Sequence, residues 1–258
     1  MTLKLTLGYS SLASRVATMV EPPSHPNWEV QLILQNPDGS DWETERSKEL
    51  SSRPDLSIEM LDSKGVAKSR NRAIWLARGE YLVFSDDDIE FDVAGLEQAI
   101  KFLDDNPKYS LLLGQAKEPS GRLRKRYPTK IQELNHFNCA RAATYEMIIR
   151  VDAVRQVGVR FDENFGAGAE NYLGDEYIFI VDLIKAGLRA VFAPVTIATH
   201  PEVSSGSGWG TDKDRRVRAK IFTRVFGPFA PFVRLAFRAR RRRELGSVKN
   251  LIKFVFGR

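Results

Sequence analysis

Short apolar runs alternate with polar and turn-forming segments as far as residue 198. Runs rich in β-branched and aromatic residues predict strands at 3–8, 29–34, 56–61, 81–84, 109–115, 144–151, 189–193 and 195–198. Segments with apolar residues three or four positions apart predict helices at 66–77, after Asp92, at 152–157 and at 174–186. Strands that alternate with helices predict an α/β fold, with a mostly parallel central sheet flanked by helices.

The strand predicted at 81–84 leads directly into three aspartates, Asp86, Asp87 and Asp88. Adjacent carboxylates repel one another, and each raises the pKa of its neighbours. A divalent cation would remove this repulsion, because Mg²⁺ and Mn²⁺ prefer oxygen ligands and because open α/β sheets bind ligands at the carboxyl ends of their strands. Taken alone, the triplet fits a solvated acidic turn, or a helix cap at Asp88, equally well.

The composition is that of an ordinary globular protein, with 43% apolar and 28% charged residues in a chain of 258. The single cysteine, Cys139, excludes an intramolecular disulfide and fits a reducing compartment. The N-terminal segment lacks the basic start and long apolar run of a signal peptide. No stretch approaches the roughly 20 apolar residues that span a bilayer. We therefore expect a soluble or peripheral protein.

Charge divides the chain into two parts, a domain at 1–212 and a tail at 213–258. The tail contains 15 Lys and Arg and 2 Asp and Glu, a net charge of +13, whereas residues 1–212 carry a net charge of −7. Apolar residues recur among the tail's arginines, which is typical of a basic amphipathic helical element at an anionic membrane surface. Alternatively, these apolar positions pack on the core. We expect 217–226 to pack and 232–258 to contact lipid, and no nucleic-acid-binding motif accompanies the charge.

Three further segments carry residues suited to phosphate binding, proton transfer or metal binding. Gly65 precedes the helix at 66–77, where main-chain amides and Arg70 could meet a phosphate or a ribose. Asp175 and Glu176 lie at the start of the helix at 174–186, where the helix dipole alone favours carboxylates. His200 follows the last predicted strand, although a lone histidine is more often structural than a metal ligand.

Taken in order, these segments resemble the family 2 glycosyltransferases of the GT-A fold, an inverting group that uses nucleotide-sugar donors. The resemblance covers about residues 3–206. It rests on Gly65-x-x-x-Ser-Arg-Asn, Gly79-Glu-Tyr, the acidic triplet in place of the family's Asp-x-Asp, and Phe161-Asp-Glu-x-Phe-Gly. The Gly-Asp-Glu segment and the later His-Pro-x-x-Ser-Ser-Gly look like those of bacterial capsule and exopolysaccharide transferases.

The resemblance implies a chemical role for several of these residues. Glu176 stands at the position of the family's catalytic base, which would take a proton from an acceptor hydroxyl. Asp175 precedes it, and because this order differs from the family's usual Glu-Asp, either residue could be the base. Asp86 and Asp88 would bracket the nucleoside diphosphate. Asp88 and His200 would be ligands of Mn²⁺ or Mg²⁺, which would neutralise charge on the departing diphosphate.

The resemblance also implies a donor site formed by Tyr9, Ser10, Gln35, Asp38, Lys68, Arg70, Asn71, Asp86 and Asp87. Family members often carry paired aspartates after the second strand, whereas this chain has a single Asp38 there. UDP-sugars are the expected donors because they are common in the family. The expected acceptor is a saccharide or a lipid-linked saccharide. The resemblance and the tail's charge together predict a cytoplasmic enzyme of cell-surface polysaccharide synthesis, peripheral at the inner face of the cell membrane.

Two other functions fit parts of the sequence. A haloacid-dehalogenase-type phosphotransferase also places Asp-x-Asp after an apolar strand, but its motif usually continues with Thr or Val where this chain has Glu90. That hypothesis leaves the Asp-Glu pair and the His-Pro segment unexplained. A membrane-surface scaffold with a degenerate glycosyltransferase fold would depend on the basic tail.

Overall fold

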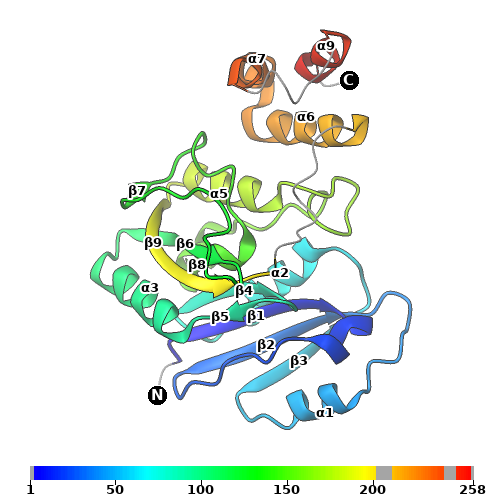
Figure 1. Ribbon diagram of the computed structural model, residues 1–258, viewed down its shortest axis with the longest axis vertical. Helices are drawn as coiled ribbons and strands as arrows, with labels where there is room; N and C mark the ends of the chain where they lie inside the picture. Colours follow the sequence, from blue (N-terminus) through cyan, green and yellow to red (C-terminus); the bar gives the residue numbers. More distant parts are fainter. Residues whose placement is uncertain (1–2, 202–210, 241–247, 257–258) are drawn as a thin grey trace.

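The computed structural model describes residues 3–201, 211–240 and 248–256, and its strands form a single mixed sheet (Figure 1). The strands are β1 (Leu5–Leu12), β2 (Trp28–Gln35), β3 (Leu56–Leu61), β4 (Tyr81–Asp86), β5 (Glu90–Phe91), β6 (Tyr109–Lys117), β7 (Gln132–Glu133), β8 (Met147–Arg150) and β9 (Arg189–Thr199). Their order in the sheet is β3-β2-β1-β4-β8-β6-β9-β5, and β7 pairs with β9.

Helices surround the sheet and continue beyond it at the carboxyl end of the chain. The α-helices are α1 (Glu45–Ser51), α2 (Val66–Leu76), α3 (Val93–Asp105), α4 (Val151–Val157), α5 (Asp175–Lys185), α6 (Asp212–Phe226), α7 (Ala230–Arg240) and α9 (Val248–Phe256). The 3₁₀ helices are η1 (Ala13–Thr18), η2 (Thr144–Glu146) and η4 (Gly227–Phe229). Among the described helices, none is long and apolar enough to cross a bilayer.

The first half of the sheet is parallel and the second half is mixed. Strands β3, β2, β1 and β4 run parallel to one another, and β6 runs parallel to β9. Strand β8 lies between β4 and β6 and is antiparallel to both. It enters the sheet from the long loop that follows β6, without a crossover helix, so it runs back in the opposite direction. The sheet is therefore mixed, with most of its paired residues in parallel ladders.

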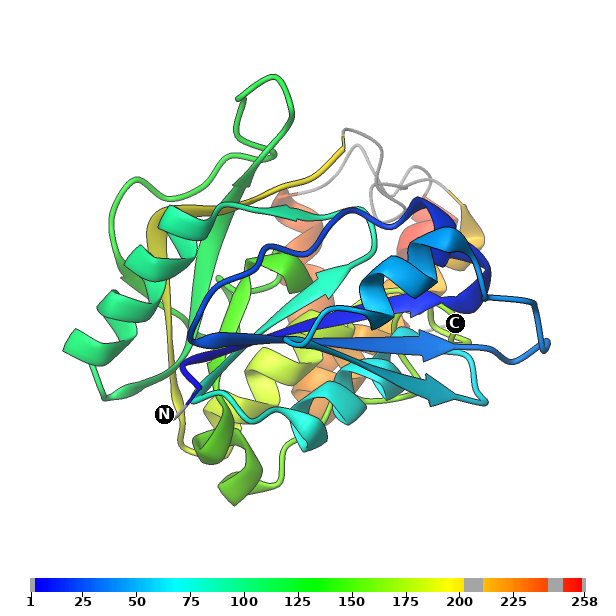
Figure 2. The same ribbon diagram turned by 90° about the horizontal axis from the view of Figure 1, so that it is seen from below.

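Helices lie on both faces of the sheet (Figure 2), and each face carries its own apolar core. On one face, Leu50 of α1 and Leu96 of α3 pack against alternate strand residues. On the other face, α2, α4 and α5 contribute to a core that includes Phe84 and Phe179. Because both faces are buried, the central strands carry nearly continuous apolar runs. Polar side chains therefore gather at the edge of the sheet where the parallel strands end.

Most elements predicted from the sequence are confirmed, but several differ. The strand expected at 144–151 begins as η2 and is a strand only at Met147–Arg150, and the short elements β5, β7 and η1 were not predicted. Helix α1 was not predicted, because its sequence is polar and contributes little more than Leu50 to the core. Strand β1 continues to Leu12, beyond the predicted end at Gly8. The two strands expected around Pro194 form one strand, β9. The register of its pairing with β6 shifts near this exposed proline, which therefore does not need to donate a hydrogen bond within a regular ladder. Asp92 caps α3 as predicted, accepting a hydrogen bond from Gly95 N at 3.1 Å.

The three C-terminal α-helices form a layer that packs through α6 on the same face of the sheet as α5 (Figure 1). Val217, Ile221 and Val225 of α6 belong to the same core as α5, as expected for residues 217–226. Helices α7 and α9 pack on α6, where Phe254 is buried beside Phe222. The serines of the His-Pro-x-x-Ser-Ser-Gly segment and the arginines at 241–243 lie outside the described residues.

Candidate active site

Arg70 of α2 is surrounded by carboxylates from two other elements. Its guanidinium forms an ion pair with Asp175 at the start of α5, and its Nη2 lies 3.4 Å from Asp86 Oδ1 at the end of β4. Glu176 Oε1 lies 3.7 Å from Nη1 of the same arginine. Arg70 and Asp175 are each 5% exposed, whereas Asp86 is 38% and Glu176 is 23% exposed. The two acidic motifs of the sequence therefore meet at one buried guanidinium.

Three carboxylates sharing one guanidinium leave an excess of negative charge. Burial raises the pKa of Asp175, Glu176 raises it further, and Arg70 acts in the opposite direction. Burial also raises the pKa of Asp86, and Arg70 again lowers it. The negative charges of Asp88, Glu176 and Asp87 raise it further. The cluster therefore favours uptake of a proton or a cation.

The position of Arg70 is fixed by contacts between α2 and the loop at 161–168. Asn71 donates a hydrogen bond from Nδ2 to Phe161 O at 3.0 Å and accepts one from Phe161 N at 2.8 Å. Val66 N donates to Ala167 O at 2.9 Å. The guanidinium of Arg70 lies 5.7 Å from the centre of the Phe161 ring. Two motifs that are far apart in the sequence thus form one support for the arginine.

Gly166 makes room for the Asp175 carboxylate. Its φ of +98° is in the left-handed region, which favours glycine, and a Cβ atom at this position would lie 2.8 Å from Asp175 Cγ. Its amide donates to Asn171 O at 2.8 Å, which fixes the turn. The glycine in the Phe-Gly part of the motif is therefore required by both backbone conformation and space.

Glu176 is the more accessible member of the acidic pair. Its Oε1 accepts a hydrogen bond from Thr144 Oγ1 at 2.7 Å, and its side chain reaches the surface of the site. Thr144 is buried in η2 and was not predicted as a site residue. No local pattern marks it, because the contact joins residues 32 positions apart.

Asp87 faces away from the cluster and holds η1 to the sheet. Its carboxylate accepts hydrogen bonds from Ser11 Oγ at 2.5 Å and from Arg15 Nη2 at 2.6 Å, and its carbonyl accepts one from Val20 N at 2.9 Å. Ser11 and Arg15 were not predicted. Neighbouring residues beyond a strand point in different directions, so the aspartate triplet does not act as one unit. In this structure Asp87 has a structural role beside the predicted donor site.

The residues predicted to bind the donor are only partly brought together. Ser10 lies opposite Asp86 in the pairing of β1 with β4, and its buried hydroxyl has no hydrogen-bond partner among the described residues. These two strands lie where the strand order reverses, which is where open α/β sheets bind ligands. Gln35 ends β2 and donates from Nε2 to Gly65 O at 3.0 Å, at the start of α2.

Other predicted donor residues are placed less favourably. Tyr9 is completely buried and its ring packs edge-on against Phe91, with centroids 6.0 Å apart, so its side chain is closed to a ligand in this structure. Asn71 has both ends of its amide engaged by Phe161. Asp38 lies exposed in the turn after β2, where hydrogen bonds from Ser40 lower its pKa. Lys68 is half-buried on α2.

Comparison with known proteins identifies the family. A profile for glycosyl transferase family 2 matches residues 9–166, which include Arg70 and the acidic triplet and end at Gly166. The chain belongs to glycosyl transferase family 2. No curated protein sequence gives a significant match.

Solved structures support the GT-A fold of this chain. S. aureus TarS matches with a TM-score of 0.64 at 16% identity, over 96% of this chain and 45% of that chain. The chain therefore spans less than half of that TarS chain. TarS 1–349 in complex with UDP and with UDP-GlcNAc matches with a TM-score of 0.64 in both cases. These matches have 16% and 15% identity and cover 98% of this chain and 81% and 82% of the TarS chains. Family membership argues against the phosphotransferase alternative.

The residues predicted to bind a metal have suitable chemistry but do not form a complete site. Asp88 is partly exposed and offers a hard carboxylate. His200 is buried beside Tyr145, with ring centroids 4.8 Å apart, and its Nδ1 lies 2.6 Å from Pro201 O, a contact that orients the ring. Within the described parts of the chain, no three His, Cys, Asp or Glu side chains group closely enough to hold a metal ion.

Proposed function

We propose that this family member is an inverting glycosyltransferase that moves a sugar from a nucleotide-sugar donor to a saccharide hydroxyl. The observation that carries this proposal is the contact of Arg70 with both Asp86, at the carboxyl end of β4, and the Asp175–Glu176 pair at the start of α5. It joins a site suited to a nucleoside diphosphate with a pair of carboxylates suited to proton transfer.

Glu176 is the proposed base, and Asp175 supports it through its ion pair with Arg70. Asp175 is buried and bound by Arg70, so its carboxylate is not free to reach an acceptor. Glu176 is more exposed, and Thr144 leaves one of its carboxylate oxygens available. Glu176 would take the proton from the acceptor hydroxyl as that oxygen bonds to the anomeric carbon and the bond to the diphosphate breaks. A single displacement of this kind inverts the anomeric centre.

The proposed donor is a UDP-sugar bound where β1 and β4 end. The fold match to TarS structures that contain UDP and UDP-GlcNAc supports this choice of nucleotide. The unpartnered hydroxyl of Ser10 beside Asp86 supports the location, since a buried polar group needs a hydrogen-bond partner. Asp88 and His200 would hold Mn²⁺ or Mg²⁺. When bound, the metal would supply positive charge to stabilise the leaving diphosphate.

Calorimetric titration with UDP, GDP, ADP and CDP, with and without Mn²⁺, tests the donor site. We expect UDP to bind with a dependence on Mn²⁺ that is lost in Asp88→Ala. Asp152→Ala is the matched control, because Asp152 is 97% exposed on α4 and outside the cluster. Binding of no nucleotide would exclude the proposed donor site. Equal binding by wild type and Asp88→Ala would exclude the metal-ligand role of Asp88.

We also propose that the C-terminal helices attach the enzyme to an anionic membrane, where a lipid-linked saccharide would be the acceptor. Helices α7 and α9 pack on α6, and Arg234 and Phe254 are buried between them. Phe232, Ile252 and Phe256 are each two positions from one of these buried residues, which places them on the opposite helix face. They are 72%, 53% and 68% exposed. Exposed apolar residues on a tail with a net charge of +13 complement an anionic lipid surface.

A further inference from the structure

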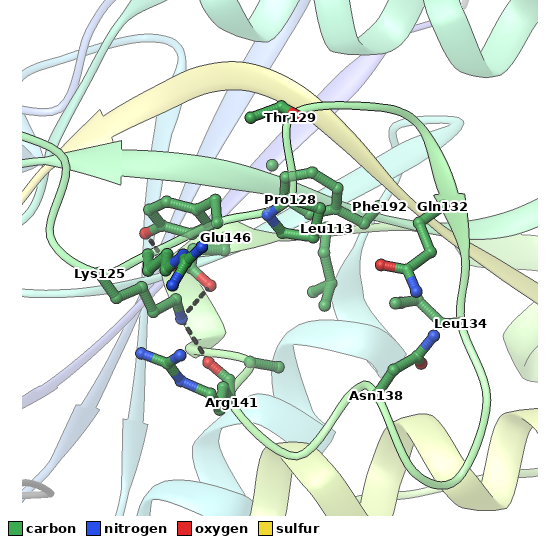
Figure 3. Close-up of a pocket in the computed structure, with 14 residues that line it drawn as sticks. Leu113, Lys125, Pro128, Thr129, Gln132, Leu134, Asn138, Arg141, Glu146 and Phe192 are labelled. Atoms are coloured by element: carbon green, nitrogen blue, oxygen red, sulfur yellow. Dashed lines mark hydrogen bonds and ion pairs between the residues drawn. The ribbon is translucent and has the colours of Figure 1, made fainter.

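A cavity lies beneath the loop that connects β6 with η2. Its volume is about 470 Å³, which is in the range of small-molecule sites. Figure 3 shows Leu113 and Phe192 at its floor, Lys125 and Glu146 on one side, and Gln132 and Asn138 on the other. No residue of this loop was predicted from the sequence to belong to a site. None of them belongs to the cluster around Arg70.

One wall of the cavity is a rigid hydrogen-bonded unit around Glu146. The buried Glu146 carboxylate accepts bonds from Lys125 Nζ at 2.7 Å, Tyr127 Oη at 2.5 Å and Ala143 N at 3.1 Å. The ring of Tyr127 stacks on Phe192, with centroids 6.1 Å apart. A flat apolar surface next to fixed polar groups suits one face of a sugar ring. The charges of Lys125 and Glu146 cancel each other within this unit.

Two positive charges at the cavity remain uncompensated. Arg126 and Arg141 both line it, and neither guanidinium has a hydrogen-bond or ion-pair partner among the residues that the structure describes. Because Lys125 is paired with Glu146, the two arginines give the cavity lining a net charge of +2. Guanidinium groups bind carboxylate and phosphate oxygens through paired hydrogen bonds. The cavity is therefore complementary to a sugar that carries an anionic group.

The cavity is linked to the proposed base by the short helix η2. Thr144 at the start of η2 donates to Glu176, and Glu146 at its end forms the wall of the cavity. We propose that this cavity binds the acceptor, a saccharide with a carboxylate or phosphate group that Arg126 and Arg141 hold. This proposal rests on the proposed transferase function, because it assigns the cavity to the acceptor side of Glu176.

The test compares two probes that differ only at one carbon, 4-nitrophenyl β-D-glucuronide and 4-nitrophenyl β-D-glucoside. Saturation-transfer NMR titrations measure their binding to the full chain. Because a charge-assisted hydrogen bond is stronger than a neutral one, we expect the glucuronide to bind at least about tenfold more tightly than the glucoside. Arg126→Gln and Arg141→Gln should each weaken glucuronide binding about three- to tenfold and leave glucoside binding unchanged.

Arg160→Gln is the matched control, since Arg160 is exposed and lies in the segment after α4, outside the cavity lining. Equal binding of the two probes, binding of neither, or full glucuronide binding by both arginine variants would overturn the proposal. UDP titration of the same samples separates the two proposals. If UDP binds but the glucuronide does not, only the acceptor cavity is wrong. If the glucuronide binds but UDP does not, the cavity holds an anionic saccharide and the donor site is wrong.

Discussion

Arg70 and Asp175 form a buried ion pair between α2 and α5, although they are 105 positions apart in the chain. Each side chain is 5% exposed, so the pair is shielded from solvent. The same arginine approaches Asp86, whose carboxylate is at the edge of the sheet. We propose that Arg70 is a positioning residue that holds Asp86, at the donor end of the site, close to Asp175 and the proposed base Glu176.

Replacement of Arg70 should destabilise the fold strongly. Arg70→Met removes the cation shared by Asp175, Asp86 and Glu176, and loss of one partner from a buried pair costs about 3–5 kcal/mol. Urea unfolding measures the change. Arg72→Met is the matched control, because Arg72 lies on the same helix and pairs with Glu59 at the surface. The control should cost at most about 1 kcal/mol. Similar losses for the two variants would contradict the role assigned to Arg70.

Replacement of Glu176 should slow sugar transfer strongly and leave donor binding intact. General-base catalysis contributes about 10²–10⁴-fold, so Glu176→Gln should reduce the rate of sugar transfer by that factor. The amide keeps the shape of the side chain and can still contact Thr144. Glu170→Gln is the control, because Glu170 is 80% exposed on the preceding loop. Measurement of kcat with a UDP-sugar donor, beside UDP affinity, distinguishes the two effects. A variant that keeps its kcat would exclude Glu176 as the base.

The carboxylate cluster should make stability depend on pH. Burial, followed by Glu176, raises the pKa of Asp175 from 3.8 to about 8. Between these values the folded chain holds a proton that the unfolded chain has released, so the free energy of unfolding falls as pH rises. Glu176→Gln removes one of the charges that raise this pKa. It should reduce the slope between pH 5 and pH 8 and be more stable than wild type at pH 8, by about 1 kcal/mol. Urea unfolding at a series of pH values measures this. If the free energy of unfolding of wild type and of Glu176→Gln changes with pH in parallel, the coupling is refuted.

Gly166 should tolerate no side chain. Gly166→Ala imposes a left-handed backbone on alanine and places its Cβ 2.8 Å from Asp175 Cγ. We expect a loss of about 1–3 kcal/mol and a fall in kcat, because Asp175 must move with its neighbour Glu176. Gly121→Ala isolates the backbone effect, since Gly121 has a φ of +85° and open space around its Cβ position. If both variants lose the same stability and keep full activity, the close contact with Asp175 is unimportant.

The sequence was sufficient to predict features that depend on local patterns. Apolar runs located the central strands, and the acidic motifs predicted carboxylates of which Asp86, Asp175 and Glu176 lie around Arg70. Contacts between distant segments could not be predicted in this way. Thr144 beside Glu176, and Ser11 and Arg15 beside Asp87, come from segments without any motif.

The sequence pattern also could not predict the direction of β8. A short apolar strand has the same period in either direction, and only the missing crossover helix before Met147 determines that it runs antiparallel. Asp87 illustrates the same limit at the level of one side chain. Its neighbours in the triplet suggested a ligand, but its contacts with Ser11 and Arg15 give it a structural role in this structure.

The outer face of α7 and α9 should control binding to anionic vesicles. Phe232→Glu and Phe256→Glu each replace an exposed aromatic ring with a charge that anionic lipid repels. Each ring adds about 1.5–3 kcal/mol when it is fully buried, so we expect each variant to bind at least about tenfold less to vesicles of phosphatidylglycerol and phosphatidylcholine. Co-sedimentation measures the bound fraction. Wild type should not bind vesicles of phosphatidylcholine alone, because the tail's charge then has no counterpart.

Trp75→Glu separates this face from a general effect of surface charge. Trp75 is 66% exposed on α2, so the substitution introduces the same charge at an equally accessible aromatic residue away from α7 and α9. It should leave vesicle binding unchanged, because lipid contact depends on the position of the ring rather than on net charge alone. Transfer to a soluble acceptor should be equal in all three variants, since none of these rings lies in the cluster around Arg70. Equal loss of vesicle binding in Trp75→Glu and Phe232→Glu would instead mean that charge alone attracts the protein to the membrane.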